Sequence, residues 1–435
     1  MTQSLPNKIL SDVTKRLIQS TEKYGTRFLS RTIEEVSDII QDQIKYLNTI
    51  DFDADFVDPR ELIHLDTNKL SLHTERVQAF LDGKRVAPIT IDMALTQKCS
   101  YACTFCYAGL QQNPSAPAIW NVYKNFLDDC KKIGHAPNEC VKAISLVSDG
   151  ESTESPYFQT FVAYAHTLGI DISVGTNGLR LENFDLDVLA ECLTYLRINF
   201  NAAHPKAYQQ VMGCSETSFN KVIQTTQTLI SLIKEKGHKV TLGYQMVLMP
   251  EYADQVLPLA SMCRDMGINY LVIKHCSDDE QGSLGVDYKW YQSEKADELL
   301  KYAERFSTAT YSSQAKWSKI RTGRDRIYSK CYGTPLLLQM SGTGIVAPCG
   351  SFFHKDYSHN HIGDIKEESF YKIWASDDYM RVINFLRSEK FDAKSMCATL
   401  CLQDKVNGQL YNIIEKDGVL TKPKRIDNIP HTNYI

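Results

Sequence analysis

The stretch CSYACTFCY, residues 99–107, is the most informative part of this chain of 435 residues. It places Cys99, Cys103 and Cys106 within eight residues, in the spacing C-x3-C-x2-C. Iron–sulfur clusters take one cysteine for each iron, and a short loop that carries three cysteines can wrap one corner of a four-iron cluster. The fourth iron is then left without a protein ligand. Such an open iron is a site for chemistry as well as for electron storage.

A structural zinc site is the alternative interpretation of these cysteines. Zinc in such sites takes four ligands, usually from paired C-x2-4-C knuckles. This group has three cysteines, and neither His nor Cys follows Cys106 within the next twenty residues. The ligand count favours a cluster, although a knuckle from a distant part of the chain would complete a zinc site.

The motif resembles that of the radical S-adenosylmethionine (radical SAM) superfamily, C-x3-C-x-aromatic-C, with Phe105 at the aromatic position. The resemblance implies a [4Fe-4S] cluster with an open iron, held by the three cysteines, and S-adenosylmethionine (SAM) as a second cofactor. It also implies reductive cleavage of SAM to a 5′-deoxyadenosyl radical, which abstracts a hydrogen atom from the substrate. The cofactors carry this chemistry, while the protein orients the reacting C–H bond and excludes side reactions.

Composition narrows the class of protein. Hydrophobic residues make up 43% and charged residues 23% of the chain, which is ordinary for a globular protein. The formal charge of -4 implies no basic face, so we expect no nucleic-acid partner. No stretch approaches the ~18 apolar residues of a membrane helix, and the first residues lack the apolar segment of a secretory signal. We therefore expect a cytoplasmic protein without membrane contact, whose clustered cysteines bind metal or do redox work.

Short apolar stretches alternate with helical patterns from residue 87 onward. We expect strands at 89–95, 141–147, 171–176, 195–200, 239–248 and 270–275, and helices such as 157–168, 218–236 and 252–266. Six βα units predict an α/β fold with a parallel sheet, which by itself fits a doubly wound sheet or a barrel. Radical SAM enzymes resemble a partial (β/α)6 TIM-type barrel. The resemblance therefore favours the barrel, with the site at the carboxyl ends of the strands.

The rest of the chain divides around this core. Residues 1–86 are expected to be a mainly helical extension, since apolar residues recur at helical spacing within 8–50, and Thr32 with Glu35 fits a capping box at the start of the second helix. Residues 87–310 form the expected radical SAM core, 325–410 a small auxiliary domain, and 411–435 a tail.

Candidate SAM contacts follow the expected strands. The family carries Gly-Gly-Glu after the second strand, and here Gly150 and Glu151 match while Asp149 departs from the pattern. The resemblance implies that Glu151 holds the SAM ammonium group, which a carboxylate does well. An Asp-Gly turn without ligand is the alternative.

Two further strand ends resemble family positions near SAM. Thr176 and Asn177 begin a Thr-Asn-Gly turn of the kind found there, which plain turn chemistry also explains. Asn199 stands where family members often have a serine, and its amide can hydrogen-bond the ribose or carboxylate of SAM.

The sixth strand runs into a dense group of ionisable residues, 274–280. Within it, His275 and Cys276 are candidate catalytic residues, as general acid–base group and as hydrogen-atom donor. Cys214 is a second candidate donor. The alternatives are an idle buried thiol for each cysteine and a solvated acidic loop for the run.

A second cysteine group lies between residues 331 and 401. Cys331 and Cys349 flank an expected hairpin at 335–348, with Gly342 at its turn, and Cys397 and Cys401 follow a helical segment at 369–386. This pattern resembles the twitch or SPASM domain that follows some radical SAM cores. The resemblance implies one auxiliary [4Fe-4S] cluster, ligated by all four cysteines and suited to electron transfer. Zinc remains open for four cysteines.

The substrate is the least constrained part of the prediction. We expect oxidation or epimerisation of a small polar metabolite, such as a sugar, an aminocyclitol or a nucleotide-linked sugar. A peptide-modifying maturase that forms crosslinks, thioethers or epimers is the alternative, and a non-catalytic iron–sulfur protein is a third possibility. A reducing protein such as flavodoxin or ferredoxin is the expected partner.

Overall fold

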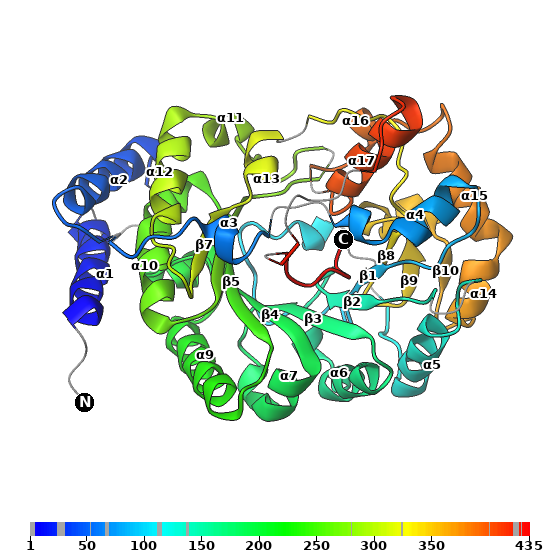
Figure 1. Cartoon of the computed structure of the whole chain (residues 1–435), viewed down its shortest axis with the longest axis horizontal. Coiled ribbons are helices and arrows are strands. Elements are labelled where there is room, and N and C mark those ends of the chain that lie inside the picture. Colours follow the sequence, from blue (N-terminus) through cyan, green and yellow to red (C-terminus); the bar gives the residue numbers. More distant parts are fainter. Residues whose placement is uncertain are drawn as a thin grey trace.

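One curved sheet organises the molecule (Figure 1). The computed structural model describes residues 5–23, 31–52, 54–65, 69–110, 115–135, 139–279, 281–322, 325–399, 401–420, 426–427 and 429–435. Its strands are β1 (Thr90–Met93), β2 (Ala143–Leu146), β3 (Asp171–Thr176), β4 (Leu193–Asn199), β5 (Thr241–Leu248), β6 (Tyr270–His275), β7 (Ser312–Ala315), β8 (Leu337–Met340), β9 (Ile345–Ala347) and β10 (Gly363–Asp364).

The strand order is β10-β9-β8-β1-β2-β3-β4-β5-β6-β7. Neighbours from β8 through β1 to β7 are parallel, whereas β8, β9 and β10 pair antiparallel. Strands β1 and β2 are buried along their whole length, as expected of parallel strands covered on both faces. The predicted fold class, a partial α/β barrel, is confirmed.

Helices cover the outer face of this sheet (Figure 1). The helices of the described residues are α1 (Leu5–Lys23), α2 (Ile33–Leu47), α3 (Pro59–Leu62), α4 (Thr74–Leu81), α5 (Trp120–Cys130), α6 (Phe158–Thr167), α7 (Leu186–Cys192), α8 (Pro205–Met212), α9 (Thr217–Lys236), α10 (Val256–Met266), α11 (Tyr288–Tyr291), α12 (Glu294–Glu304), α13 (Trp317–Thr322), α14 (Phe370–Ala375), α15 (Asp377–Leu386), α16 (Ala393–Met396) and α17 (Asp404–Glu415). No helix among the described residues is both long and apolar enough to cross a membrane.

The expected N-terminal helices are present and lie against the outside of the barrel. Helix α1 packs on α10, and α2 begins with the predicted capping box, in which Thr32 and Glu35 bond each other's backbone N–H. Arg31 and Asp254 form a buried ion pair of 2.9 Å that joins the start of α2 to the loop before α10.

Two regions differ from the expected layout. The predicted helix over 369–386 is divided into α14 and α15, because Ser376 leaves the helical conformation and caps α15 by accepting from the Tyr379 N–H. The hairpin β8–β9 continues the barrel sheet through β8 and β1, and β7 lies beyond the expected end of the core at residue 310. The boundaries that we assigned to the four parts stay a prediction.

The C-terminal segment 429–435 lies inside the barrel, near the amino ends of the strands (Figure 1). Thr90 Oγ1 donates to the Asn433 carbonyl at 2.6 Å, and Asn433 Nδ2 donates to Asp171 at 2.8 Å. Segment 429–435 is therefore bonded to both β1 and β3.

Candidate functional site

The loop that carries the first three cysteines follows β1 and is held from behind by the end of α8. The backbone N–H groups of Ala102 and Thr104 donate to the carbonyls of Gly213 and Val211, at 3.2 and 3.0 Å. Gly213 has a φ of 56°, and a Cβ there would overlap the Ala102 backbone. A glycine at this helix end therefore lets the loop approach closely.

All three cysteines line one cavity, which we call the cluster cavity, at the carboxyl ends of the strands. Burial raises the pKa of Cys99 to about 11 and that of Cys103 still further, so both thiols are neutral until a metal displaces their protons. Asn177 Nδ2 lies 3.8 Å from the Cys99 sulfur and 3.2 Å from Ser100 Oγ.

The other predicted contacts surround the same space. Phe105, Gly150, Glu151, Asn177 and Asn199 line the cluster cavity together with the cysteines. The structure thus brings together residues from the ends of four different strands.

Glu151 is 4% exposed and accepts four hydrogen bonds. Its Oε1 accepts from Thr176 Oγ1 at 2.8 Å and from the N–H and hydroxyl of Thr153, and its Oε2 accepts from the Asn177 N–H at 2.7 Å. Burial raises the pKa of this carboxyl, while the hydrogen bonds oppose that rise. Thr176 is fully buried and is not among the residues that line the cluster cavity. Its hydroxyl instead donates to Glu151, which does line the cavity.

Asp149, which departs from the family pattern, has a structural role. It is 1% exposed and accepts from Gln97 Nε2 at 2.6 Å and from the Gly342 N–H at 2.7 Å. A Cβ on Gly150 or on Gly342 would overlap the Thr96 backbone. The start of the cysteine loop is thus packed between the turn after β2 and the turn of the β8–β9 hairpin.

The three predicted catalytic residues lie outside the cluster cavity. Cys276 is fully buried, with its sulfur 3.9 Å from the Phe105 carbonyl, and His275 Nδ1 lies 2.6 Å from the Cys276 carbonyl. Burial lowers the pKa of His275 to about 4, so its ring is neutral. Cys214 packs behind the cysteine loop, next to Gly213.

The acidic run after β6 builds a turn. Asp278 is buried and accepts from the N–H groups of Leu284 and Val286, and its own carbonyl accepts from Thr399 Oγ1 at 2.9 Å. The alternative of a solvated loop is therefore wrong for Asp278. Glu280 lies outside the described residues.

The second cysteine group also converges. Cys331, Cys349, Cys397 and Cys401 line one small pocket, the auxiliary pocket. Asn407 Nδ2 lies 3.5 Å from the Cys331 sulfur, and the Tyr328 hydroxyl lies 3.7 Å from the Cys401 sulfur. Donors aimed at sulfur suit bound thiolates, so this donor set fits a cysteine-ligated cluster.

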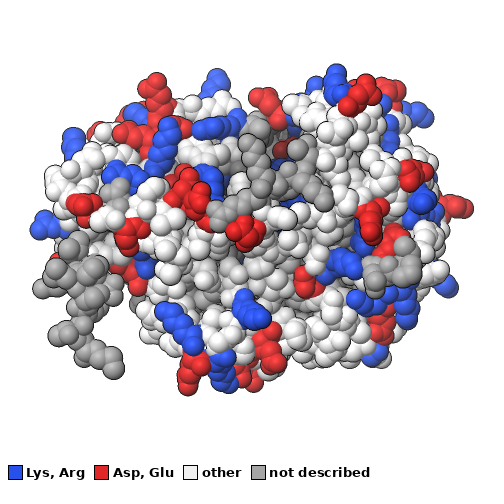
Figure 2. Space-filling view, in the orientation of Figure 1, with Lys and Arg blue, Asp and Glu red and all other residues white. Residues whose placement is uncertain are grey.

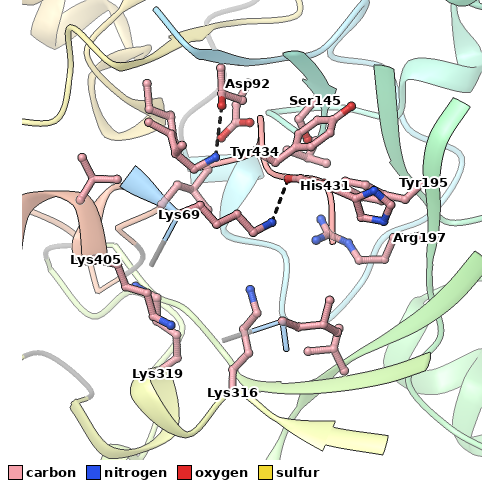
Figure 3. Close-up of a pocket in the computed structure, with 18 of the residues that line it drawn as sticks. Lys69, Asp92, Ser145, Tyr195, Arg197, Lys316, Lys319, Lys405, His431 and Tyr434 are labelled. Carbon is pink, nitrogen blue, oxygen red and sulfur yellow. Dashed lines mark hydrogen bonds between the residues drawn. The ribbon is translucent and has the colours of Figure 1, made fainter. Parts of the chain in front are cut away.

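A third space, the barrel cavity, is lined by residues of β1, β2, β4, β6 and β8 and of the C-terminal segment 429–435 (Figure 3). Its volume is about 220 Å³. Alternate residues of each strand face inward, so β4 contributes Tyr195 and Arg197 here and Asn199 to the cluster cavity. Arg197 and Val147 line both cavities, so the two cavities adjoin at these two side chains.

The residues that line the barrel cavity were not predicted from the sequence as site residues. Asp92 is the charged residue of β1 and Arg197 that of β4, and both line the barrel cavity. A charge within such a strand is the signal that could have indicated them, because both faces of a parallel sheet are normally buried.

Comparison with known proteins agrees with this geometry. Residues 93–263 match the radical SAM superfamily, and residues 331–402 match SPASM, an iron-sulfur cluster-binding domain. A curated protein from Selenomonas ruminantium, an S-adenosylmethionine-dependent nucleotide dehydratase, is 26% identical over 173 residues, which cover 39% of this chain and 60% of that protein. The match thus spans less than two thirds of that relative.

Solved structures with the same fold include SuiB of Streptococcus suis. Its complex with S-adenosylmethionine has a TM-score of 0.55 and 14% identity, covering 84% of this chain and 81% of SuiB. Its complex with the precursor peptide SuiA has a TM-score of 0.55 and 13% identity, covering 91% and 87%. At this identity the likeness concerns the fold.

Proposed function

We propose that this chain, which belongs to the radical SAM superfamily and carries a C-terminal SPASM domain, abstracts a hydrogen atom from a small polar metabolite held inside its barrel. The observation that supports the proposal most is the junction of the two cavities at Arg197 and Val147. A molecule in the barrel cavity would reach the space where the cysteines and the SAM motifs meet.

The residues of the cluster cavity fit a SAM-binding [4Fe-4S] cluster. Cys99, Cys103 and Cys106 would hold three irons, and the cofactors together supply reductive SAM cleavage to a 5′-deoxyadenosyl radical. Glu151 would accept hydrogen bonds from the SAM ammonium group, and Asn177 and Asn199 would bond its polar groups. Their partners already fix these side chains before a ligand enters, so little ordering is needed on binding.

The auxiliary pocket would hold a second [4Fe-4S] cluster, which supplies one-electron transfer. Tyr107 is half-buried in the wall of the cluster cavity, and desolvation together with the nearby Cys106 and Cys349 raises its pKa. Both cysteine groups thus lie near one side chain. A donor such as flavodoxin or ferredoxin would provide the reducing electron.

Oxidation fits the placement of the cysteines better than epimerisation does. A radical epimerase needs a thiol that returns a hydrogen atom to the substrate, and neither Cys276 nor Cys214 lines either cavity. Oxidation removes a hydrogen atom, then one electron and one proton. Asp92 in the barrel cavity, whose pKa burial raises to about 7, is a suitable acceptor for the proton.

Three observations favour a small metabolite over a peptide. The barrel cavity lies within the barrel, is lined in part by segment 429–435, and carries charged side chains such as Asp92 and Arg197. The described N-terminal elements are helices, whereas a β-rich leader-peptide module is what the peptide alternative expects. The Selenomonas relative, by its name, acts on nucleotides.

The test is anaerobic SAM cleavage by the reconstituted, reduced protein, followed as 5′-deoxyadenosine. We expect cleavage by wild type, none by Cys103→Ala, and wild-type rates from Cys276→Ala. Loss of product but not of SAM cleavage in Cys276→Ala would make that thiol the hydrogen donor and replace oxidation by epimerisation. No cleavage by wild type would favour a non-catalytic iron–sulfur protein.

A further inference from the structure

The barrel cavity is strongly cationic although the chain is acidic overall, with a formal charge of -4. Figure 2 shows basic and acidic side chains interspersed on the face in view. Inside the barrel, by contrast, Asp92 is the side-chain carboxylate among the described lining residues. The cationic side chains of the cavity are Lys69, Arg197, Lys316, Lys319 and Lys405.

These cations come from separate elements and converge (Figure 3). The ammonium groups of Lys69 and Lys316 and the guanidinium of Arg197 point toward one another across the cavity. Like charges that converge in a buried space repel, and each also loses hydration. Lys69 donates to the His431 carbonyl at 3.0 Å and Lys319 pairs with Asp404 at 3.6 Å, and an anion bound among the cations would relieve the repulsion that remains.

Arg197 is the central side chain of this group. Its Nε is buried and has no hydrogen-bond partner among the described residues. Gly175 on the neighbouring strand leaves room for it, because a Cβ there would lie 3.1 Å from an Arg197 amino nitrogen. The guanidinium therefore has room beside Gly175, an unused donor and a place in the lining of both cavities.

Lys274 adds a cation on the side of the cluster cavity. Burial, with the neighbouring Arg197 and Lys316, lowers the pKa of Lys274 to about 7. Burial, with Lys316 and Lys405, lowers the pKa of Lys69 to about 7 as well. An anion between these groups would offset the repulsion by the neighbouring cations and favour the charged form of both lysines.

We infer that the substrate carries a phosphate or pyrophosphate group, which Arg197 and Lys274 bind at the junction of the two cavities. A guanidinium presents a planar set of N–H donors that matches phosphate oxygens, and an ammonium adds a point charge. This inference rests on the proposed function, because it names the substrate class of the same site.

The test is calorimetric titration of the anaerobically reconstituted, SAM-bound protein with inorganic pyrophosphate. We expect binding that weakens at least tenfold in Arg197→Gln and in Lys274→Gln. Lys206→Gln removes one cation from α8, away from both cavities, and should bind as wild type does. Uncharged myo-inositol should not bind.

Iron content and 5′-deoxyadenosine formation are measured on the same samples. Arg197→Lys retains the charge and should bind pyrophosphate more tightly than Arg197→Gln does. A loss of affinity caused by misfolding would instead affect both variants. SAM cleavage without pyrophosphate binding, or binding that Arg197→Gln leaves unchanged, would overturn the inference and leave the proposed function standing. Loss of SAM cleavage in wild type would instead overturn the proposed function.

Discussion

Glu151 shows how one buried carboxylate can be prepared for a cationic ligand. Four hydrogen bonds fix its position, and its burial removes competing water. We predict that Glu151→Gln lowers SAM affinity at least tenfold, because a neutral amide loses the charge-assisted bond to the SAM ammonium, worth about 1.5–3 kcal/mol. Calorimetry or the SAM-induced change in the EPR spectrum would measure the affinity of each variant for SAM.

Glu154 provides a matched control for this experiment. It lies in the same turn of helix but pairs with Arg180 at 3.0 Å, on the outer side. Glu154→Gln should bind SAM normally. Equal SAM affinities for wild type and Glu151→Gln, at equal iron content, would contradict the role given to Glu151.

Lys274 makes stability depend on pH. The groups that face it are Arg197 on β4, Lys316 and Lys319 after β7, and Cys276, and burial with these cations lowers its pKa to about 7. In the unfolded chain its pKa is about 10.4, so between pH 7 and pH 10 the unfolded state binds more protons. Stability therefore rises with pH in this window, by up to ~1.4 kcal/mol per pH unit from this group.

Lys274→Met should remove that contribution. We predict that urea unfolding of the variant shows a smaller gain in the free energy of unfolding between pH 7 and pH 9 than wild type does. We also predict higher stability of the variant at pH 7, since a buried charge is replaced by an apolar chain of similar length. Parallel pH profiles for the two proteins would show that Lys274 keeps its ordinary pKa.

At the scale of elements, the β8–β9 hairpin supports the first cysteine loop. Gly342 in its turn contacts the Thr96 backbone, and its N–H donates to Asp149 at 2.7 Å. We predict that Gly342→Ala displaces the loop and lowers SAM cleavage about tenfold or more, since misplaced groups of about 1 Å cost roughly that much. The auxiliary cysteines should keep their iron.

Gly408→Ala in α17 is the control for this substitution. Its added methyl group would meet Ile327 at 3.8 Å, an ordinary contact. The variant should cleave SAM as wild type does. If Gly342→Ala also retains full activity, the hairpin does not position the loop.

The sequence predicted the elements whose signals are local. Strands β3 and β6 have the predicted limits, and the capping box at Thr32 is present. Strand β7 was missed because its Ser-Ser-Gln-Ala sequence lacks an apolar pattern. The barrel cavity was missed because Lys69, Arg197 and Lys405 come from three distant parts of the chain that only the tertiary fold brings together, which spacing along the chain does not reveal.

At the scale of the whole molecule, segments far apart in sequence pack together around the two cysteine groups. The sheet runs without interruption from the SPASM hairpin, β8–β9, into the barrel. Segment 429–435 lies inside the barrel and is bonded to β1. Leu70, Val77 and Phe80 of the N-terminal part pack with Leu336 and Leu410 of the C-terminal part. The two cysteine groups are therefore positioned by a single packed structure.

We propose that this protein holds two iron–sulfur clusters, one of which binds SAM. Anaerobic iron and sulfide analysis with EPR tests it most directly, on wild type and on the variant with Cys99, Cys103 and Cys106 all replaced by Ala. We predict about eight irons in wild type and about four in the variant, with a SAM-induced change of the EPR signal in wild type alone. About four irons plus one zinc in wild type would make the auxiliary site structural, and no iron after reconstitution would contradict the account.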